Sequence, residues 1–164
     1  MANKIIASGT VDLLLGSDHR GLKLKEHITD WIMQDVSPID FAVMYDVGTY
    51  NDKRCDYPDI VKSFAKQFDI YSVGILVCGS GFGVSIAANR FDGIRAVVCR
   101  TVQEAIMARK HNNANVLCLG SDYTMQLPAF DIIKAFVKTD FEKGRHQKRV
   151  NMLKRLNRWI KNFT

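Results

Sequence analysis

The segment Cys78-Gly79-Ser80-Gly81-Phe82-Gly83 holds the residue types that most clearly favour chemistry. It follows an apolar run, VGILV, and precedes the helical pattern VSIAANRF. Glycines allow a tight turn in which backbone N–H groups approach a ligand closely, and N–H groups that open a helix attract anions. The segment departs from GxGxxG, because Val84 stands where the last glycine would be, and it lacks the Gly-Lys-Ser/Thr of a P-loop. A plain strand-to-helix turn explains one glycine but not three, so the segment predicts a cradle for an oxyanion or a small phosphate.

Cys78 stands at the end of the strand predicted before this cradle. A thiol at a helix N-terminus ionises more readily than a free one, which would suit a general base or a nucleophile. A lone cysteine at a strand end is more often structural, but the adjoining glycines favour the functional interpretation. The other cysteines are Cys55, Cys99 and Cys118, and no CxxC pair suggests a zinc or redox site. We interpret Cys99 and Cys118 as buried thiols.

Other polar candidates stand at the ends of predicted elements; they are Asp18, His19, His111, Asn112, Arg145 and Arg149. The first two close the first strand. The histidine and asparagine at 111 and 112 precede the last strand, in a turn expected near the same crevice, although capping or surface positions would explain them too. The two arginines are four residues apart, so they share a helical face and could clamp one phosphate. A solvated basic face is the alternative interpretation of that pair.

Apolar runs alternate with helical patterns over the whole chain of 164 residues. Strands that are apolar on both faces require helices on both sides, which predicts one α/β domain with a doubly wound, five-stranded parallel sheet of Rossmann or flavodoxin-like type. We expect the strand order 2-1-3-4-5, which places the turns after strands 1 and 3 side by side at the topological switch point. The predicted strands cover 11–18, 41–48, 73–79, 94–99 and 114–119, residues 1–10 form an N-terminal extension without assigned structure, and 144–162 form a C-terminal helix.

Net charge and hydropathy narrow the function classes. The net charge is +6, but eight of the 23 Lys and Arg residues follow position 142, where no acidic residue occurs. The basic tail could bind nucleic acid or a small phosphate, and the rest of the chain is slightly acidic, so nucleic acid is the weaker alternative. No apolar run has the roughly 18 residues of a membrane helix, and the first ten residues lack a signal peptide's apolar core. We expect a cytoplasmic protein.

Taken together, the motifs resemble type B ribose-5-phosphate isomerase, in the sugar-phosphate isomerase family that includes the galactose-6-phosphate isomerase subunits. The likeness covers about residues 11–156 and rests on GSDH at 16–19, DYP at 56–58, ILVCGSGFGVSIAANR at 75–90, GIRAVVC at 93–99, HNNANVLCLGS at 111–121 and GRHQKRV at 144–150. The galactose-6-phosphate subunits typically lack either the loop cysteine or the histidine and arginines that this chain has. The resemblance therefore favours interconversion of ribose 5-phosphate and ribulose 5-phosphate over a hexose 6-phosphate such as allose or galactose 6-phosphate.

The resemblance also implies roles for the matching residues. Cys78 would move a proton between C1 and C2, the Gly79–Gly83 backbone with Ser80 would stabilise the enediolate, and His111 would open the sugar ring. It implies no metal or organic cofactor, and a homodimer, in some members a tetramer, with sites shared between subunits. Asn112 would hold a hydroxyl, and the other implied contacts are substrate binding by Asp18, His19, Tyr57, Gly79, Gly81, Phe82 and Gly83 and phosphate binding by Arg145 and Arg149.

One position departs from the family pattern. Arginine, a phosphate ligand, commonly follows the GS of the fifth strand, but this chain has Asp122. A carboxylate near a phosphate dianion repels it. We therefore expect either Arg20 or Arg100, which both stand near predicted strand ends, to replace the lost cation at the phosphate; a phosphate that binds in a different place is the alternative.

Overall fold

A computed structural model describes residues 3–6, 11–34, 39, 41–69 and 73–160 of the chain. Among them, six strands form one sheet in the order β1-β3-β2-β4-β6-β5. Five of the strands run parallel, which confirms the predicted α/β class. The bounds are β1 Asn3–Ile6, β2 Val11–Ser17, β3 Phe41–Asp46, β4 Val73–Cys78, β5 Ala96–Val98 and β6 Val116–Gly120.

The predicted strand order is wrong in its last two places. Counted as in the sequence prediction, the five parallel strands have the order 2-1-3-5-4, because β6 lies between β4 and β5. Every residue of β6 is buried, whereas β5 has three residues of which two are only half-buried. A strand that is buried throughout needs a hydrogen-bonded neighbour on each side, so the short β5 takes the edge. The adjacency of strands 1 and 3, here β2 and β4, is as expected.

The opposite edge of the sheet contains a strand that the sequence prediction lacked. β1 pairs antiparallel with β3, from Asn3 opposite Asp46 to Ile6 opposite Val43. The N-terminal extension therefore includes a sheet edge within its described residues. A strand of four residues with a lysine in it carries too little apolar periodicity to predict.

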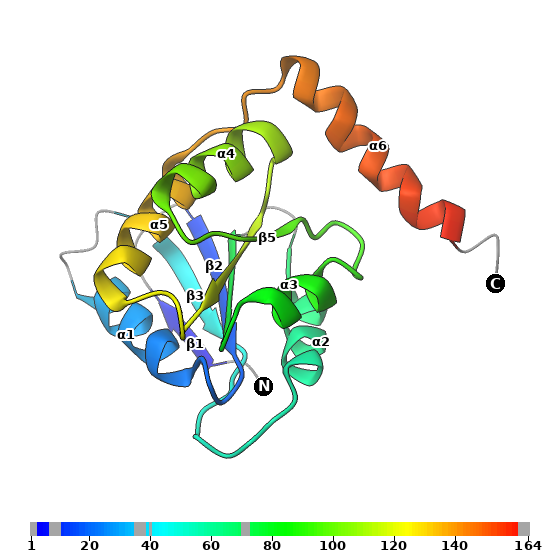
Figure 1. Ribbon diagram of the computed structural model, residues 1–164. Coiled ribbons are helices and arrows are strands. Elements are labelled where there is room, and N and C mark those ends of the chain that lie inside the picture. The colour runs from blue at the N-terminus through cyan, green and yellow to red at the C-terminus, as the bar shows by residue number, and fades with distance from the viewer. Residues whose placement is uncertain (1–2, 7–10, 35–38, 40, 70–72, 161–164) are drawn as a thin grey trace.

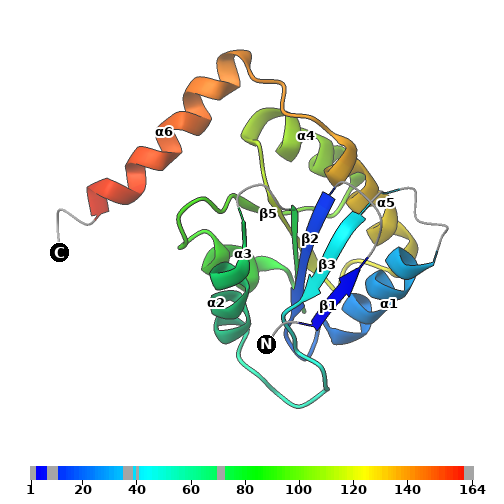
Figure 2. The same cartoon turned by 180° about the vertical axis from the view of Figure 1, so that it is seen from behind.

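Helices cover both faces of the sheet, as Figures 1 and 2 show. One core joins β2 and β4 to residues of α1 (Leu22–Met33), α4 (Val102–Asn112) and α5 (Gln126–Lys138). The second core, on the other face, joins the sheet to α2 (Tyr57–Gln67) and α3 (Phe82–Ala88). Pro58 stands in the first turn of α2, where its missing N–H is harmless, and a Thr101–Glu104 capping box starts α4.

The last helix, α6 (Gly144–Ile160), leaves the body of the domain (Figures 1 and 2). Its first turns stay close to the domain, where Val150 is buried and shares a pocket of about 330 Å³ with Leu153, Leu156 and Ile94. The apolar helix face that the sequence predicts is therefore present at Val150, Leu153 and Leu156. The side chain of Ile160, the fourth predicted position, lies outside the described residues. Leu153 and Leu156 remain 44% and 58% exposed, so the described part of the chain leaves the apolar face of α6 partly uncovered. No helix among the described residues is long and apolar enough to cross a membrane.

Candidate active site

The glycine segment forms a compact turn between β4 and α3. Cys78 ends β4 with its side chain 5% exposed, and its Sγ accepts a hydrogen bond from the N–H of Gly81 at 3.1 Å. Gly81 has φ +80°, the left-handed conformation that glycine adopts without strain. Side chains larger than hydrogen would also meet the backbone of Leu119 there, at 3.2 Å. The thiol and the amide hydrogens are therefore within contact, as the sequence predicts.

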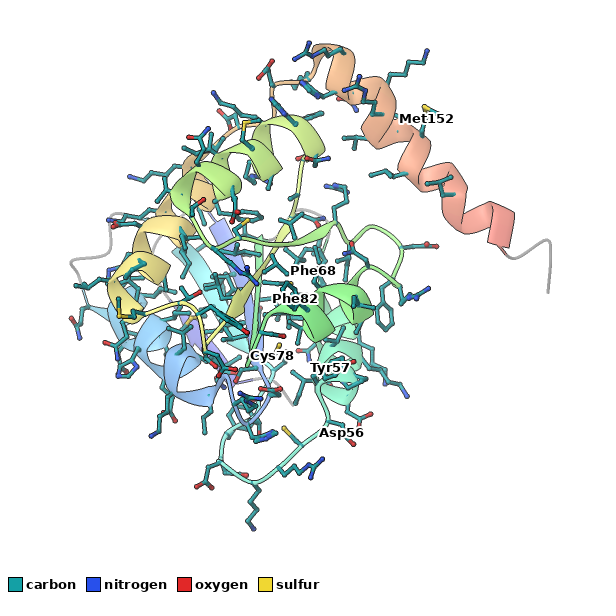
Figure 3. The ribbon with its side chains drawn as sticks, viewed as in Figure 1. Asp56, Tyr57, Phe68, Cys78, Phe82 and Met152 are labelled. Atoms are coloured by element: carbon teal, nitrogen blue, oxygen red, sulfur yellow. The ribbon has the colours of Figure 1, made fainter. Side chains whose placement is uncertain are left out.

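The absence of a side chain at Gly83 allows the ring of Tyr57 to pack against this turn. A Cβ on Gly83 would stand 2.9 Å from Cζ of Tyr57, so the phenol ring lies directly against the cradle. Figure 3 shows Tyr57 and Phe82 near Cys78 at one end of the sheet. The Ser80 hydroxyl accepts a hydrogen bond from the N–H of Phe82 at 3.3 Å and so helps to shape the turn.

Asp18 and His19, which follow β2, are at the same edge of the sheet. Asp18 is buried, and its Oδ1 accepts from the N–H groups of Arg20 and Gly21 at 2.9 and 3.0 Å, which fixes the start of α1. The Nδ1 of His19 accepts from the N–H of Cys55 at 3.3 Å. Since that nitrogen is an acceptor, the proton of the neutral ring is on Nε2 and can be donated to a ligand.

Asp122 forms an ion pair with Arg20, one of the two arginines that the sequence analysis considered as a replacement cation. Its carboxylate lies 2.5 Å from the guanidinium of Arg20. Both groups lie over Gly79, whose Cβ would be 2.7 Å from Nε of Arg20 and 3.1 Å from Oδ2 of Asp122. Arg20 therefore neutralises the negative charge of Asp122, and the replacement of the missing phosphate ligand by a cation stays a prediction.

A buried ion pair, which the sequence analysis did not single out, supports the loop that leads to Tyr57. Lys25 is 2% exposed, and its Nζ contacts both carboxylate oxygens of Asp46, at 2.6 and 2.8 Å, and the carbonyl of Thr49 at 2.7 Å. The N–H of Gly48 donates to the same carboxylate at 2.9 Å. A lysine within the apolar stripe of a helix, here in line with Ile28 and Ile32, is the signal that could have found it.

His111 and Asn112 lie at the amino ends of the parallel strands, whereas Cys78 lies at their carboxyl ends. The expectation that their turn borders the same crevice is therefore wrong within one chain. They end α4 and precede β6, whose first residue, Val116, pairs with Gly74 at the amino end of β4. Cys78 is at the carboxyl end of that strand. At roughly 3.3 Å per residue, the strand alone separates the two ends by about 13 Å.

Two half-buried arginines hold the turn at 111–115 in shape. Arg109 donates to the carbonyl oxygens of Ala114 and Thr139, and Nε of Arg95 donates to that of Asn113. Burial lowers the pKa of both guanidiniums; the nearby charge of Arg109 lowers that of Arg95 further, whereas Asp140 acts in the opposite direction on Arg109. The polar groups that precede β6 are therefore rigidly placed.

Arg145 and Arg149, in the first turns of α6, lie close enough to His146 for their charges to act on it. They belong to a second cluster, which consists of His111, Asn112, Glu142, Arg145, His146 and Arg149. The ring of His146 stacks on His111 with centroids 4.2 Å apart and an angle of 7°, and Nε of Arg145 lies 3.3 Å from Nε2 of His146. Burial, His111 and Arg145 lower the pKa of His146. His111 also lies 3.9 Å from the Glu142 carboxylate.

Among the described residues, three members of this cluster have the side-chain types and spacing that could hold a metal ion. Ligand atoms of His111, Glu142 and His146 lie within 4.8 Å of one another. The two imidazole rings are nearly parallel, however, and the in-plane lone pairs of parallel rings do not converge on one ion. The arrangement is better suited to binding an anion or transferring a proton than to holding a metal.

The fold and the cradle together define a class of protein: an open α/β protein with a glycine-lined turn at the switch point, which is the place where such folds bind small ligands. Residues 13–153 match the model of the Ribose/Galactose Isomerase family, and the chain belongs to that family. The resemblance drawn from the motifs is thereby confirmed.

Relatives of the chain cover nearly all of its length. Ribose-5-phosphate isomerase B of Escherichia coli is 38% identical over 143 residues, which are 86% of this chain and 93% of that protein. The structure of ribose-5-phosphate isomerase B from Clostridium thermocellum has a TM-score of 0.84 at 36% identity and covers 92% of this chain and 99% of its own. That of the Mycoplasma genitalium enzyme with bound ribulose-5-phosphate has a TM-score of 0.79 at 35% identity, covering 92% and 98%.

Proposed function

We propose that the protein interconverts ribose 5-phosphate and ribulose 5-phosphate. The observation that carries this proposal is the hydrogen bond from the Gly81 N–H to Sγ of Cys78, at the start of α3. This contact supports the proposal, because a thiol that can accept a proton lies beside a backbone donor of the kind that stabilises an anion. The relatives named ribose-5-phosphate isomerase B support the choice of sugar over a hexose 6-phosphate.

In the proposed reaction the Cys78 thiolate removes the proton from C2 of the open-chain aldose. The C–H electron pair forms the C1=C2 double bond, and the carbonyl electrons move to O1, which becomes the enediolate oxygen. A proton passes from O2 to O1, and the thiol returns its proton to C1, so atoms and charge balance. Backbone N–H groups of the loop from Gly79 to Gly83, with Ser80, stabilise the charge on oxygen. Asp18, His19, Tyr57 and Phe82 bind the sugar.

The second cluster completes the site from another copy of the chain. His111 opens the furanose ring, Asn112 holds a hydroxyl, and Arg145 and Arg149 bind the phosphate. Within a single chain, the length of a strand separates these residues from Cys78. We therefore propose a homodimer with shared sites, which can pair into a tetramer. The uncovered apolar face of α6 supports this assembly. The cytoplasmic location stays a prediction.

The base role is tested by exchange of the C2 proton of ribose 5-phosphate with deuterated water. In Cys78→Ala we expect exchange and turnover to fall by about 10²-fold or more, the loss of a general base, while ribose 5-phosphate still binds. Cys55→Ser is the matched control and keeps the wild-type rate. Full exchange in Cys78→Ala would remove Cys78 from the mechanism. A panel that includes allose and galactose 6-phosphates tests the substrate, and faster turnover of either would overturn the ribose assignment.

A further inference from the structure

A second arginine, Arg100, stands at the rim of the cradle and has a different environment from Arg20. It follows β5, and its guanidinium lies 5.1 Å from the ring centroid of Phe82 and 5.0 Å from that of Tyr123. Phe82 is the first residue of α3, inside the glycine segment. A Cβ on Gly81 would contact Val98, two residues before Arg100, at 3.2 Å, so the end of β5 lies against the same turn.

The two arginines differ in charge compensation. Arg20 lies 2.5 Å from the carboxylate of Asp122. Arg100 makes no ion pair with any described carboxylate within 4 Å. Glu104, in the next turn of the chain, accepts hydrogen bonds from the backbone N–H of Arg100 at 2.6 Å and from that of Thr101 at 3.3 Å. No described carboxylate therefore pairs with the guanidinium of Arg100 at the rim of the cradle.

The aromatic rings also determine which part of Arg100 is available. Aromatic faces attract the face of a guanidinium, and its five N–H donors lie in the plane. A guanidinium held by ring faces therefore keeps donors free at its edges, in the fork that matches phosphate oxygens. Phe82 and Tyr123 are 49% and 63% exposed, so this place is open to a ligand.

We propose that Arg100 binds the substrate phosphate on the chain that carries Cys78, and that Phe82 and Tyr123 are its positioning residues. The inference rests on the proposed function for the identity of the substrate, but not for the binding of phosphate. It assigns a different part to Arg20, which with Asp122 forms a neutral pair over Gly79 and is not a phosphate ligand. Arg100 would then act beside Arg145 and Arg149 of the second copy.

Inorganic phosphate is the probe, measured by calorimetry with the wild-type protein and with Arg100→Met. The variant loses one charge-assisted interaction, so we expect the dissociation constant to rise about tenfold. Lys66→Met removes one exposed positive charge from α2 and is the matched control, with unchanged affinity. The double variant Arg20→Met/Asp122→Asn removes the neutral pair and should also leave phosphate affinity unchanged.

Kinetics with ribose 5-phosphate separate binding from chemistry. In Arg100→Met we expect the same increase in KM, with kcat within about twofold of wild type, because the residue binds the non-reacting end of the substrate. Tyr123→Leu should raise KM less, and Arg100→Lys should restore part of the affinity. A wild-type protein that turns over no ribose 5-phosphate would refute the proposed function and leave the calorimetry as the test of Arg100. Equal phosphate affinity in Arg100→Met and wild type, no phosphate binding by either, or a loss in the double variant alone would each overturn the assignment.

Discussion

Replacing Lys25 with methionine should destabilise the domain more than any exposed substitution. The methylene stem of Lys25 is preserved in methionine, so the main change is the loss of the ammonium group that contacts Asp46 and the Thr49 carbonyl. Removing one member of a buried ion pair costs about 3–5 kcal/mol, because the other charge stays buried without its partner. The Asp46 side chain retains 13% of its exposure and still accepts from the Gly48 N–H, which favours the lower limit. We therefore expect a loss of about 3 kcal/mol.

Thermal and urea unfolding of Lys25→Met measure this loss. A change of 3 kcal/mol in a chain of this length lowers Tm by roughly 6–12 °C. The double variant Lys25→Met/Asp46→Asn removes the unpaired charge and keeps an acceptor for the Gly48 N–H, so it should be more stable than Lys25→Met alone. All samples need the same protein concentration, because any dimer couples stability to association. A loss below about 1 kcal/mol, or a double variant no more stable than the single one, would refute the reasoning.

Three further predictions follow from individual sites. In Gly83→Ala, a gain in helix propensity of about 1 kcal/mol offsets the displacement of the Tyr57 ring, so Tm should hold while KM rises; an unchanged KM would exclude Tyr57 from substrate binding. Burial raises the pKa of Cys99 to about 12 and that of Cys118 as well, so native protein at pH 8 should not be alkylated at either, as peptide mass mapping would show. Because the pKa of His146 is lowered, its contribution to stability is present above the usual value of 6.5 and lost as the pH falls; Tm should drop between about pH 7 and 5, and less in His146→Asn.

The fold class was predictable because the decisive elements are simple. β4 and β6 are buried along their whole length, and only a sheet covered on both faces accommodates such strands. The order of the last two strands depends on which of them has enough length to be paired on both sides, and β5 retains only Ala96–Val98. Apolar runs in the sequence do not show how many of their residues the ladder uses.

The cradle was predictable for a related reason. Every strand in a parallel sheet ends at the same edge, so the turn at Cys78 and the turn at Asp18 had to meet. The same rule, applied to His111, would have corrected its placement, since a turn before a parallel strand lies at the amino edge. Interactions over long sequence separations, such as Lys25 with Asp46 and Arg20 with Asp122, involve side chains whose partners no local pattern specifies.

The separation of Cys78 from His111 gives a test of whether one site is built from two chains. Cys78→Ala and His111→Asn should each be inactive as pure proteins. In a mixed dimer with shared sites, one site combines both substitutions and the other combines the intact Cys78 of one chain with the intact His111 of the other. If half of the dimers are mixed after the subunits are unfolded and refolded together, activity should return to about a quarter of the wild-type value. If each chain contained a whole site, every chain in the mixture would lack one of the two groups. Activity that stayed at the level of the separate variants, in a sample shown by mass spectrometry to contain mixed dimers, would contradict the shared site.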